Sequence, residues 1–364
     1  MRFDQLLQLM EDKLASDVYL KANQPPVFRI NGVLVPLSEQ PPLAEEDMQD
    51  YVRHVLDEKQ LRILEVDREM DVAYSLEGDL RFRINLFYQQ GALGIVCRRI
   101  KREILTFQDL NLPAEVMEKL SLEPRGLILI TGAAGSGKTT TLAAMINFIN
   151  QRKKKHIITI EDPVEFTYVE DKCIINQREV GFDTRSFQGA LKYVIRQAPD
   201  VIVIGEMRDL ETMTSAIMAA EVGHLVISSL HTIDVSQTLE RIINFFPAFQ
   251  HLQIRMQLSF VLKGIVAQRL IARKDKEGRV PACEVLISTP TARKQIMEGK
   301  TEDLLKTIEA GKIVGMQTFN QSILKLYQAG KISYQDAMEN SDNPELLELA
   351  IKGIFTGADT FKIH

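Results

Sequence analysis

Hydrophobic positions in the first hundred residues follow a helical spacing and then a strand-like one. Phe3, Leu6, Leu7, Met10 and Leu14 recur three to four residues apart, which predicts an amphipathic helix. Strand-like runs follow at residues 17–20, 27–30, 33–35, 70–75, 80–88 and 93–100, and a helical pattern occupies about residues 44–66. We expect a small α+β domain over residues 1–100, with four or five antiparallel strands and two helices.

Short polar segments predict the turns of this domain. Asn31-Gly32 separates two of the strand-like runs and suits a type I′ hairpin turn, because both residues accept positive φ. Glu77-Gly78-Asp79 separates the runs 70–75 and 80–88 in the same way. Residues 101–125 are more polar and contain Pro113 and Pro124, so we expect an interdomain linker there.

The pattern changes to strand followed by helix between residues 126 and 290. Short apolar runs occur at residues 127–131, 156–160, 201–204, 225–229 and 282–287, each separated from the next by a segment of helical length. This alternation predicts an α/β domain, a parallel sheet with helices on both faces. Residues 291–364 form a helical and polar C-terminal region without a motif of its own.

Composition agrees with a globular protein of two domains. The chain has 364 residues, 45% of them hydrophobic and 26% charged, with a net charge of −5. It contains neither a run of eighteen apolar residues nor a signal-like amino terminus, so we expect a cytosolic protein. Cys97, Cys173 and Cys283 lie far apart, which disfavours zinc and disulfides and predicts buried free thiols. A slightly acidic chain lacks the broad basic footprint of a nucleic-acid binder.

The most specific motif is Gly132-Ala133-Ala134-Gly135-Ser136-Gly137-Lys138-Thr139, which follows the apolar run 127–130 and precedes the helix-like stretch 140–149. In this P-loop setting, glycines let backbone N–H groups turn toward phosphate oxygens. Lys138 would reach the terminal phosphates and the Thr139 hydroxyl would hold Mg²⁺. Thr140 completes the candidate ATP-binding set. An ordinary glycine-rich turn is the alternative, and the strand and helix context disfavours it.

Two groups of carboxylates follow apolar strands. Glu206 comes after the run 201–204 and Gly205, which fits the Walker B role of holding Mg²⁺. Glu161-Asp162-Pro163-Val164-Glu165 follows the run 156–160. Acids gathered at a strand end repel one another unless a metal or an attacking water uses them, and we select Glu165 as the base that positions the water. A surface acid and a solvated acidic turn are the alternatives.

Histidines and arginines extend the candidate site. His224 and His231 bracket the run 225–229, where they could report on a γ-phosphate, although satisfied core histidines are common. Arg81, Arg83, Arg98 and Arg99 lie on neighbouring predicted strands, with Arg81 and Arg83 on one face. They form either a solvated strand face or, in a ring, arginine fingers directed at the next subunit.

Together, the P-loop, the acidic segment 160–166, the run 205–209 and the histidine segment 223–232 resemble the Walker A, Asp box, Walker B and His box of the secretion ATPases. The resemblance is closer to the type IV pilus retraction ATPases of the PilT and PilU type, and it extends over nearly the whole chain. The segments that carry it are residues 15–20, 81–85, 176–181 and 315–319.

This resemblance implies a hexameric, ATP-hydrolysing motor. It implies an N-terminal PAS-like domain and a RecA-like P-loop ATPase domain, with nucleotide held between the two. Hydrolysis of the nucleotide would let the two domains move relative to one another. The resemblance implies that Glu165 is the catalytic glutamate, that Glu206 is the Walker B acid, that Glu161 belongs to the same acidic group, and that His224 and His231 form the His box. Arg81, Arg83 and Arg98 correspond to the arginines that this family directs at nucleotide.

The implied partners are identical subunits in a homo-hexamer, a pilus platform protein at the inner membrane and a paralogous retraction ATPase, with no nucleic acid. The implied location is the cytoplasmic face of the inner membrane. Residues 292–298 read Ala-Arg-Lys-Gln-Ile-Met-Glu, where typical PilT proteins have Ala-Ile-Arg-Asn-Leu-Ile-Arg. This departure weakens a simple PilT assignment, so an accessory ATPase that works with a partner motor is kept as an alternative. A RecA-like nucleic-acid translocase is another, since the same core drives strands through rings. A non-hydrolysing regulator is the third, and intact Glu165 and Glu206 disfavour it.

Overall fold

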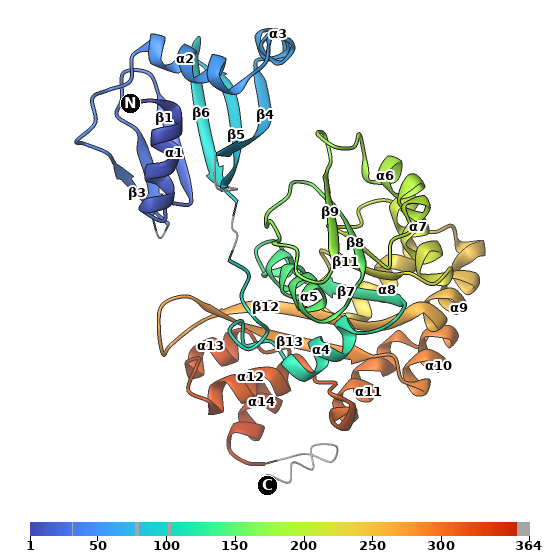
Figure 1. Cartoon of the computed structure of the whole chain (residues 1–364). Coiled ribbons are helices and arrows are strands. Elements are labelled where there is room, and N and C mark those ends of the chain that lie inside the picture. The colour runs from blue at the N-terminus through green and yellow to red at the C-terminus, as the bar shows by residue number, and fades with distance from the viewer. Residues whose placement is uncertain (31, 77–79, 101–102, 355–364) are drawn as a thin grey trace. The chain divides into compact units, whose positions relative to one another are not determined.

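The computed structural model describes residues 1–30, 32–76, 80–100 and 103–354. The chain forms two compact units (Figure 1). The first contains residues 1–102 together with residues 165–167, and the second contains the remainder. Each unit is built around its own hydrophobic core.

The first unit contains a six-stranded antiparallel sheet in the order β3-β2-β1-β6-β5-β4. Its elements are α1 (Phe3–Asp12), β1 (Asp17–Lys21), β2 (Val27–Ile30), β3 (Val33–Pro36), α2 (Glu45–Val55), α3 (Glu58–Asp67), β4 (Glu69–Leu76), β5 (Leu80–Gln89) and β6 (Ala92–Arg99). Alternation along β5 directs Phe82, Ile84 and Leu86 into a core shared with α1 and α2, and leaves Arg81 and Arg83 on the other face.

Two expectations for this unit need correction. The sheet has six strands, because the short β2 and β3 each form a full pairing partner. The helical pattern over residues 44–66 is two helices, because Leu56 adopts an extended conformation and the Asp57 side chain accepts a hydrogen bond from the Gln60 N–H at 2.8 Å, which starts α3. The predicted turns at Asn31 and at residues 77–79 fall outside the described residues.

The second unit contains a seven-stranded sheet in the order β13-β12-β7-β11-β10-β8-β9. Its elements are α4 (Ala114–Ser121), β7 (Gly126–Thr131), α5 (Lys138–Arg152), β8 (His156–Glu161), β9 (Ile174–Glu179), α6 (Phe187–Val194), β10 (Val201–Ile204), α7 (Leu210–Glu221), β11 (Leu225–Leu230), α8 (Val235–Asn244), α9 (His251–Val261), β12 (Leu262–Ala272), β13 (Arg279–Ile287), α10 (Pro290–Glu298), α11 (Leu304–Ala310), α12 (Phe319–Gln328), α13 (Tyr334–Glu339) and α14 (Pro344–Ile351).

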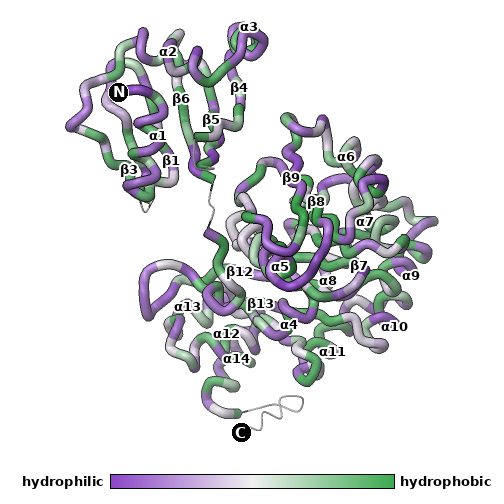
Figure 2. The backbone as a smooth tube through the Cα atoms, viewed as in Figure 1, coloured by the Kyte–Doolittle hydropathy of each residue, from purple (hydrophilic) through white to green (hydrophobic). Residues whose placement is uncertain are grey.

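The predicted parallel sheet with helices on both faces is confirmed for the strands from β12 to β9. Alternate residues of β7 enter opposite layers, Leu127 and Leu129 with α6 to α9, and Ile128 and Ile130 with α4 and α5. Figure 2 shows the hydrophobic colour concentrated along these central strands. Burial on both faces explains why they lack the alternation of the first unit.

The expectation that residues 282–287 form a parallel strand was wrong. They belong to β13, which runs antiparallel to β12. The connection between the two strands covers only residues 273–278, which is long enough for a hairpin but too short for a crossover. Sequence reasoning also missed β12 and β9. The first follows directly on α9 without a break, and the second is a polar edge strand in which Ile174 is 60% exposed.

Residues flanking the sheet belong to the second unit. Phe107, Leu112 and Met117, from the segment expected to be a linker, are buried in its core. Ile296 of α10 and Phe319 of α12 are also buried, the latter against β12 and β13. The three cysteines are free and buried, as predicted. Across the described ranges, no helix combines the length and the apolar character that a membrane span requires.

Candidate functional site

The P-loop connects the carboxyl end of β7 to the first turn of α5, as predicted. Gly132, Gly135 and Gly137 have φ values of +146°, +74° and +89°, which favour glycine. At Gly132 a Cβ atom would also lie 2.3 Å from the backbone oxygen of Gln268, so only glycine fits between the loop and β12. The loop therefore depends on glycine for both its backbone conformation and its packing.

Lys138 is folded against its own loop. Its Nζ atom donates hydrogen bonds to the backbone oxygens of Gly132 at 2.8 Å and Ala133 at 3.0 Å, and the residue is only 8% exposed. Thr139 and Thr140 follow in the first turn of α5 and are half-buried. A buried ammonium group beside a helix N-terminus makes this loop electropositive, which suits an anion such as phosphate.

The outer rim of the loop is accessible, whereas Ser136 is buried behind it. Ala133, Ala134 and Gly135 are exposed. Ser136 is 5% exposed, and its backbone oxygen accepts a hydrogen bond from the side chain of Gln268 in β12. The rim is therefore the part of the loop that an anion can reach.

Gln268 of β12 clamps the loop and was missed from the sequence. Its Nε2 atom donates to the backbone oxygen of Ser136 at 2.7 Å, and its Oε1 atom accepts from the Thr141 hydroxyl at 2.9 Å. The residue is 2% exposed. A single amide within the apolar strand 262–272 is the signal that could have found it.

Glu206 and His231 meet at the carboxyl edge of the parallel sheet, where β10 and β11 end. His231 Nε2 lies 2.8 Å from Glu206 Oε2, and His231 Nδ1 lies 3.4 Å from Lys138 Nζ. Because an ammonium group can only donate, the Nδ1 atom accepts and the proton is on Nε2, which donates to Glu206. The ring is then neutral, and burial, followed by the positive charges of Lys138 and Arg208, lowers its pKa.

The Glu206 carboxylate also has a cationic neighbour. Arg208, two residues further along, forms an ion pair with Glu206 Oε1. The Glu206 side chain is 14% exposed, and that of Arg208 is 63% exposed. The Ser229 hydroxyl donates to the backbone oxygen of Gly205 at 2.6 Å, which ties the Glu206 segment to β11. Lys138, His231, Glu206 and Arg208 thus form one charged cluster.

The acidic segment after β8 separates into a buried and an exposed part. Glu161 is 8% exposed and accepts hydrogen bonds from the Thr159 hydroxyl at 2.5 Å and from Gln177 Nε2 at 3.1 Å. Glu165 is exposed. The Val164 N–H donates to Glu179 Oε2 at 3.1 Å, so a buried carboxylate of β9 holds the residue directly before Glu165. Glu161 is therefore part of the sheet framework, while Glu165 is accessible to solvent.

His224 lies at the opposite end of β11 from His231. Its Nδ1 atom lies 2.8 Å from the backbone oxygen of Pro199, at the amino edge of the sheet. A six-residue strand separates the two histidines, and at about 3.3 Å per residue this amounts to roughly 20 Å. The fold of one chain therefore does not bring His224 to the P-loop, because the two ends of a parallel strand lie on opposite edges.

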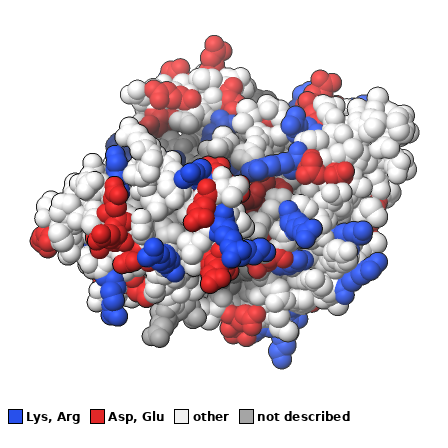
Figure 3. All heavy atoms as spheres, turned by 90° about the horizontal axis from the view of Figure 1, so that it is seen from above, with Lys and Arg blue, Asp and Glu red and all other residues white. Residues whose placement is uncertain are grey.

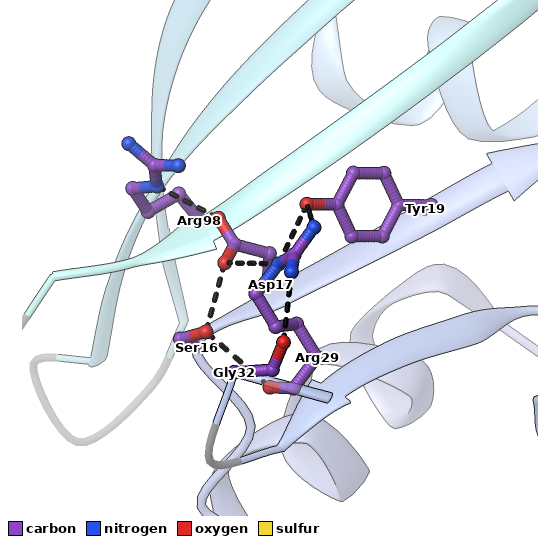
Figure 4. Close-up of polar contacts among 6 residues, drawn as sticks. All are labelled: Ser16, Asp17, Tyr19, Arg29, Gly32 and Arg98. Carbon is purple, nitrogen blue, oxygen red and sulfur yellow. Dashed lines mark hydrogen bonds and ion pairs between the residues drawn. The ribbon is translucent and has the colours of Figure 1, made fainter. Parts of the chain in front are cut away.

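The predicted arginines lie in the first unit, on the sheet face that its helices leave uncovered. Arg83 and Arg98 are direct cross-strand neighbours, and Arg81 is two residues before Arg83 on the same face. Arg83 pairs with Asp71, with Nη2 3.0 Å from Oδ2. Arg98 Nε donates to Asp17 Oδ1 at 2.7 Å (Figure 4). Arg99 points to the other side and pairs with Glu11 at 3.0 Å.

A cavity of about 430 Å³ lies beside the first turn of α5. Gly137, Thr140 and Thr141 form its wall toward the P-loop, and apolar residues line much of the rest: Leu105, Leu110, Leu112, Leu270 and Pro281. Polar and charged residues complete the lining: Asp109, Asn111, Gln268, Arg273, Lys276, Glu277 and Arg279. The sequence did not reveal this cavity, because residues 105–112 had the composition of a linker.

The site contains no ready-made metal cage. Within the described ranges, no group of three or more His, Cys, Asp or Glu side chains could hold a metal ion. Basic and acidic side chains are interspersed on the face shown in Figure 3. A divalent cation here would need ligands from a bound anion in addition to one or two protein groups.

Three comparisons with known proteins agree. Residues 3–362 match the family model described as type II/IV secretion system protein. The chain is 45% identical over 352 residues to the type IV pilus ATPase PilU of Pseudomonas aeruginosa, which covers 97% of this chain and 92% of that protein. It is 40% identical over 345 residues to the type IV pilus retraction ATPase PilT of the same organism, covering 95% and 99%. The crystal structure of the pilus retraction motor PilT with bound ADP matches with a TM-score of 0.88 and 44% identity, covering 96% and 99%.

Proposed function

Because the chain belongs to the type II/IV secretion system protein family and, within it, to the type IV pilus retraction ATPases, we propose that it is a hexameric motor in which ATP hydrolysis drives pilus retraction. The observation that carries the catalytic proposal is the cluster in which His231 connects Lys138 of the P-loop to Glu206. It joins a phosphate-binding loop to a carboxylate at the sheet edge where ligands of α/β proteins bind.

Phosphate binding is assigned to the P-loop. The exposed rim, residues 133–135, presents backbone N–H groups. Lys138 exchanges the backbone oxygens of Gly132 and Ala133 for phosphate oxygens. The cavity lined by Leu110, Thr141 and Leu270 receives the base, because it adjoins the first turn of α5 and combines apolar side chains with polar ones. The ADP in the matched PilT crystal structure supports a nucleotide as the ligand.

Thr139 and Glu206 are the groups that would hold Mg²⁺, together with phosphate oxygens and water. When bound, the ion neutralises charge on the phosphates. The residues fit this task, since a hydroxyl in the first turn of α5 and a carboxylate after β10, on the same edge of the sheet, supply hard oxygen ligands. Glu206 would exchange its contact with Arg208 for this coordination.

The hydrolytic step is assigned to Glu165 as the base. Its exposed carboxylate accepts a proton from the attacking water, and Glu161 maintains the strand end from which the segment begins. His231, in its neutral Nε2–H form, holds the Glu206 carboxylate in place.

Charge on the phosphates is stabilised by arginines of the first unit of a chain in the ring, namely Arg81, Arg83 and Arg98. His224 is available only to another subunit. Hydrolysis changes the relative arrangement of the two units, and this movement is the output of the motor.

The motor works at the cytoplasmic face of the inner membrane against a pilus platform protein.

An accessory role beside a paralogous retraction ATPase is the second candidate. Residues 292–298 of α10 favour it, since they depart from the PilT pattern, and so does the 45% identity to PilU. The accessory role would appear as normal ATP hydrolysis without retraction by this chain alone.

Hydrolysis and binding measured separately test the site. Lys138→Ala should abolish ATP binding, whereas Glu206→Gln should bind ATP and lose turnover. Addition of DNA should leave the wild-type rate unchanged, because the proposed output is not strand translocation. A wild-type rate in either variant would contradict the site, and strong stimulation by DNA with steep salt dependence would favour a translocase instead.

A further inference from the structure

Charged residues form a row across four adjacent strands on the uncovered face of the first sheet. Arg29 of β2 is the cross-strand partner of Asp17 in β1, Asp17 is the partner of Arg98 in β6, and Arg98 is the partner of Arg83 in β5. Side chains directly opposite each other are close enough for like charges to repel. Asp17 is the anion placed between two of these cations.

Asp17 is buried although it lies on this face. It is 3% exposed, and both of its oxygens have partners. Oδ1 accepts from Arg98 Nε at 2.7 Å, and Oδ2 accepts from the Ser16 hydroxyl at 2.8 Å. Arg29 Nε lies 3.7 Å from Oδ2 and adds a second ion pair. The carboxylate therefore has a fixed position and orientation.

Arg29 and Arg98 use their guanidinium groups differently. Arg29 donates from Nε and Nη2 to the Tyr19 hydroxyl at 3.0 and 2.8 Å, and from Nη1 to the backbone oxygen of Gly32 at 3.0 Å. Each of its nitrogens is engaged within the unit. Of the Arg98 nitrogens, only Nε has a hydrogen bond among the described residues, and Figure 4 shows the two terminal nitrogens directed away from Asp17.

We propose that Asp17 is a positioning residue for ATP hydrolysis, which holds Arg98 with its terminal nitrogens presented to a nucleotide phosphate. The guanidinium group is planar, so a hydrogen bond at Nε restricts the orientation of the whole group. The Arg98 side chain is 69% exposed, and an exposed arginine without this contact would lose far more conformational freedom on reaching a phosphate. The inference rests on the proposed function of Arg98.

A purely structural ion pair is the competing explanation, and a double-mutant cycle separates the two. The full chain is assayed for ATP hydrolysis as wild type, Asp17→Asn, Arg98→Ala and the double variant. Glu11→Gln is the matched control, because Glu11 pairs with Arg99, the residue next to Arg98, on the opposite side of the sheet. Melting temperature and mass are measured for every variant.

If Asp17 acts through Arg98, Arg98→Ala lowers kcat by about a thousandfold or more, within the range of arginine-finger effects. Asp17→Asn lowers kcat at least tenfold, while KM for ATP changes less than twofold, and the double variant matches Arg98→Ala. Glu11→Gln keeps the wild-type kcat. If Asp17→Asn does not assemble, Ser16→Ala, which removes one contact of the carboxylate, should lower kcat about threefold with assembly intact.

Two results would overturn the positioning role while leaving the proposed function in place. One is a wild-type kcat in Asp17→Asn when Arg98→Ala is impaired. The other is a double variant in which the two losses multiply, since Asp17 would then act independently of Arg98. A wild-type kcat in Arg98→Ala would instead reject the proposed role of Arg98, and the inference with it.

Discussion

His231 Nε2 lies 2.8 Å from Glu206 Oε2 and links the ends of two neighbouring parallel strands. The other nitrogen of the same ring lies 3.4 Å from Lys138 Nζ. One neutral imidazole therefore touches both the lysine of the P-loop and the carboxylate proposed to hold Mg²⁺. A change at the phosphates can reach Glu206 through a single side chain.

Replacement of His231 should reduce turnover more than nucleotide binding. In His231→Ala the Glu206 carboxylate loses its hydrogen-bond donor, and we expect kcat to fall by about 10²-fold, with the Kd for ADP nearly unchanged. Steady-state hydrolysis and ADP titration measure the two effects. Replacement of His251, whose Nε2 lies 2.9 Å from the Phe246 backbone oxygen away from this cluster, should affect neither.

The kcat for ATP hydrolysis should also fall in acid, because His231 becomes protonated. Its pKa lies below the ordinary 6.5, as burial and then Lys138 and Arg208 disfavour the imidazolium. The active neutral form should persist down through pH 6.5, with kcat falling only at lower pH. Between the two pKa values the unfolded chain binds more protons than the folded chain, so this group lowers stability as pH falls through 6.5. A kcat that halves near pH 7.5 would contradict this assignment.

Gln268→Leu should weaken nucleotide binding by releasing the P-loop. The backbone oxygen of Ser136 and the hydroxyl of Thr141 both lose their partner, and we expect KM for ATP to rise about tenfold with a loss of about 1–3 kcal/mol in stability. Gln317→Leu is the control, since Gln317 is also buried and bonds Cys283 and Lys325 far along the chain from the P-loop. If both variants change KM equally, the clamp has no specific role.

Two of the P-loop glycines, Gly132 and Gly135, should respond differently to alanine. A Cβ atom at Gly132 would lie 2.3 Å from the backbone of Gln268, whereas at Gly135 it would meet nothing within 4 Å. Gly132→Ala should abolish ATP binding, while Gly135→Ala, strained only by its φ of +74°, should lose about 1 kcal/mol and keep measurable hydrolysis. Isothermal titration with ADP distinguishes them, and equal affinities would show that the loop relaxes around both.

Local features of the chain predicted the P-loop, the flanking strand and helix, and the strand ends that carry Glu206 and His231. These signals lie within a few residues of one another, so spacing alone reveals them. Gln268 could not be predicted in this way, because its bond to Ser136 joins residues 132 positions apart and depends on the pairing of β12 with β7. The register Ala267 with Thr131 is set by the assembled sheet.

The same distinction applies to the first unit. Alternation along β5 placed Arg81 and Arg83 on one face, but nothing in the local pattern showed that Asp17, 81 residues before Arg98, would be buried beneath it. The cavity beside α5 was missed for a different reason. Its lining includes Leu105 and Leu110, which come from a segment whose prolines and polar residues resembled a linker. The opposite wall comes from the β12–β13 hairpin, which exists only once the two strands have paired.

Steady-state ATP hydrolysis of the wild-type chain beside Glu165→Gln, with molecular mass from light scattering on the same samples, tests the central claim most directly. The amide cannot accept the proton of the attacking water, so the account predicts that both proteins form hexamers and that kcat in the variant falls by at least 10²-fold. A monomeric wild type, or equal rates in the two proteins, would contradict the proposed motor.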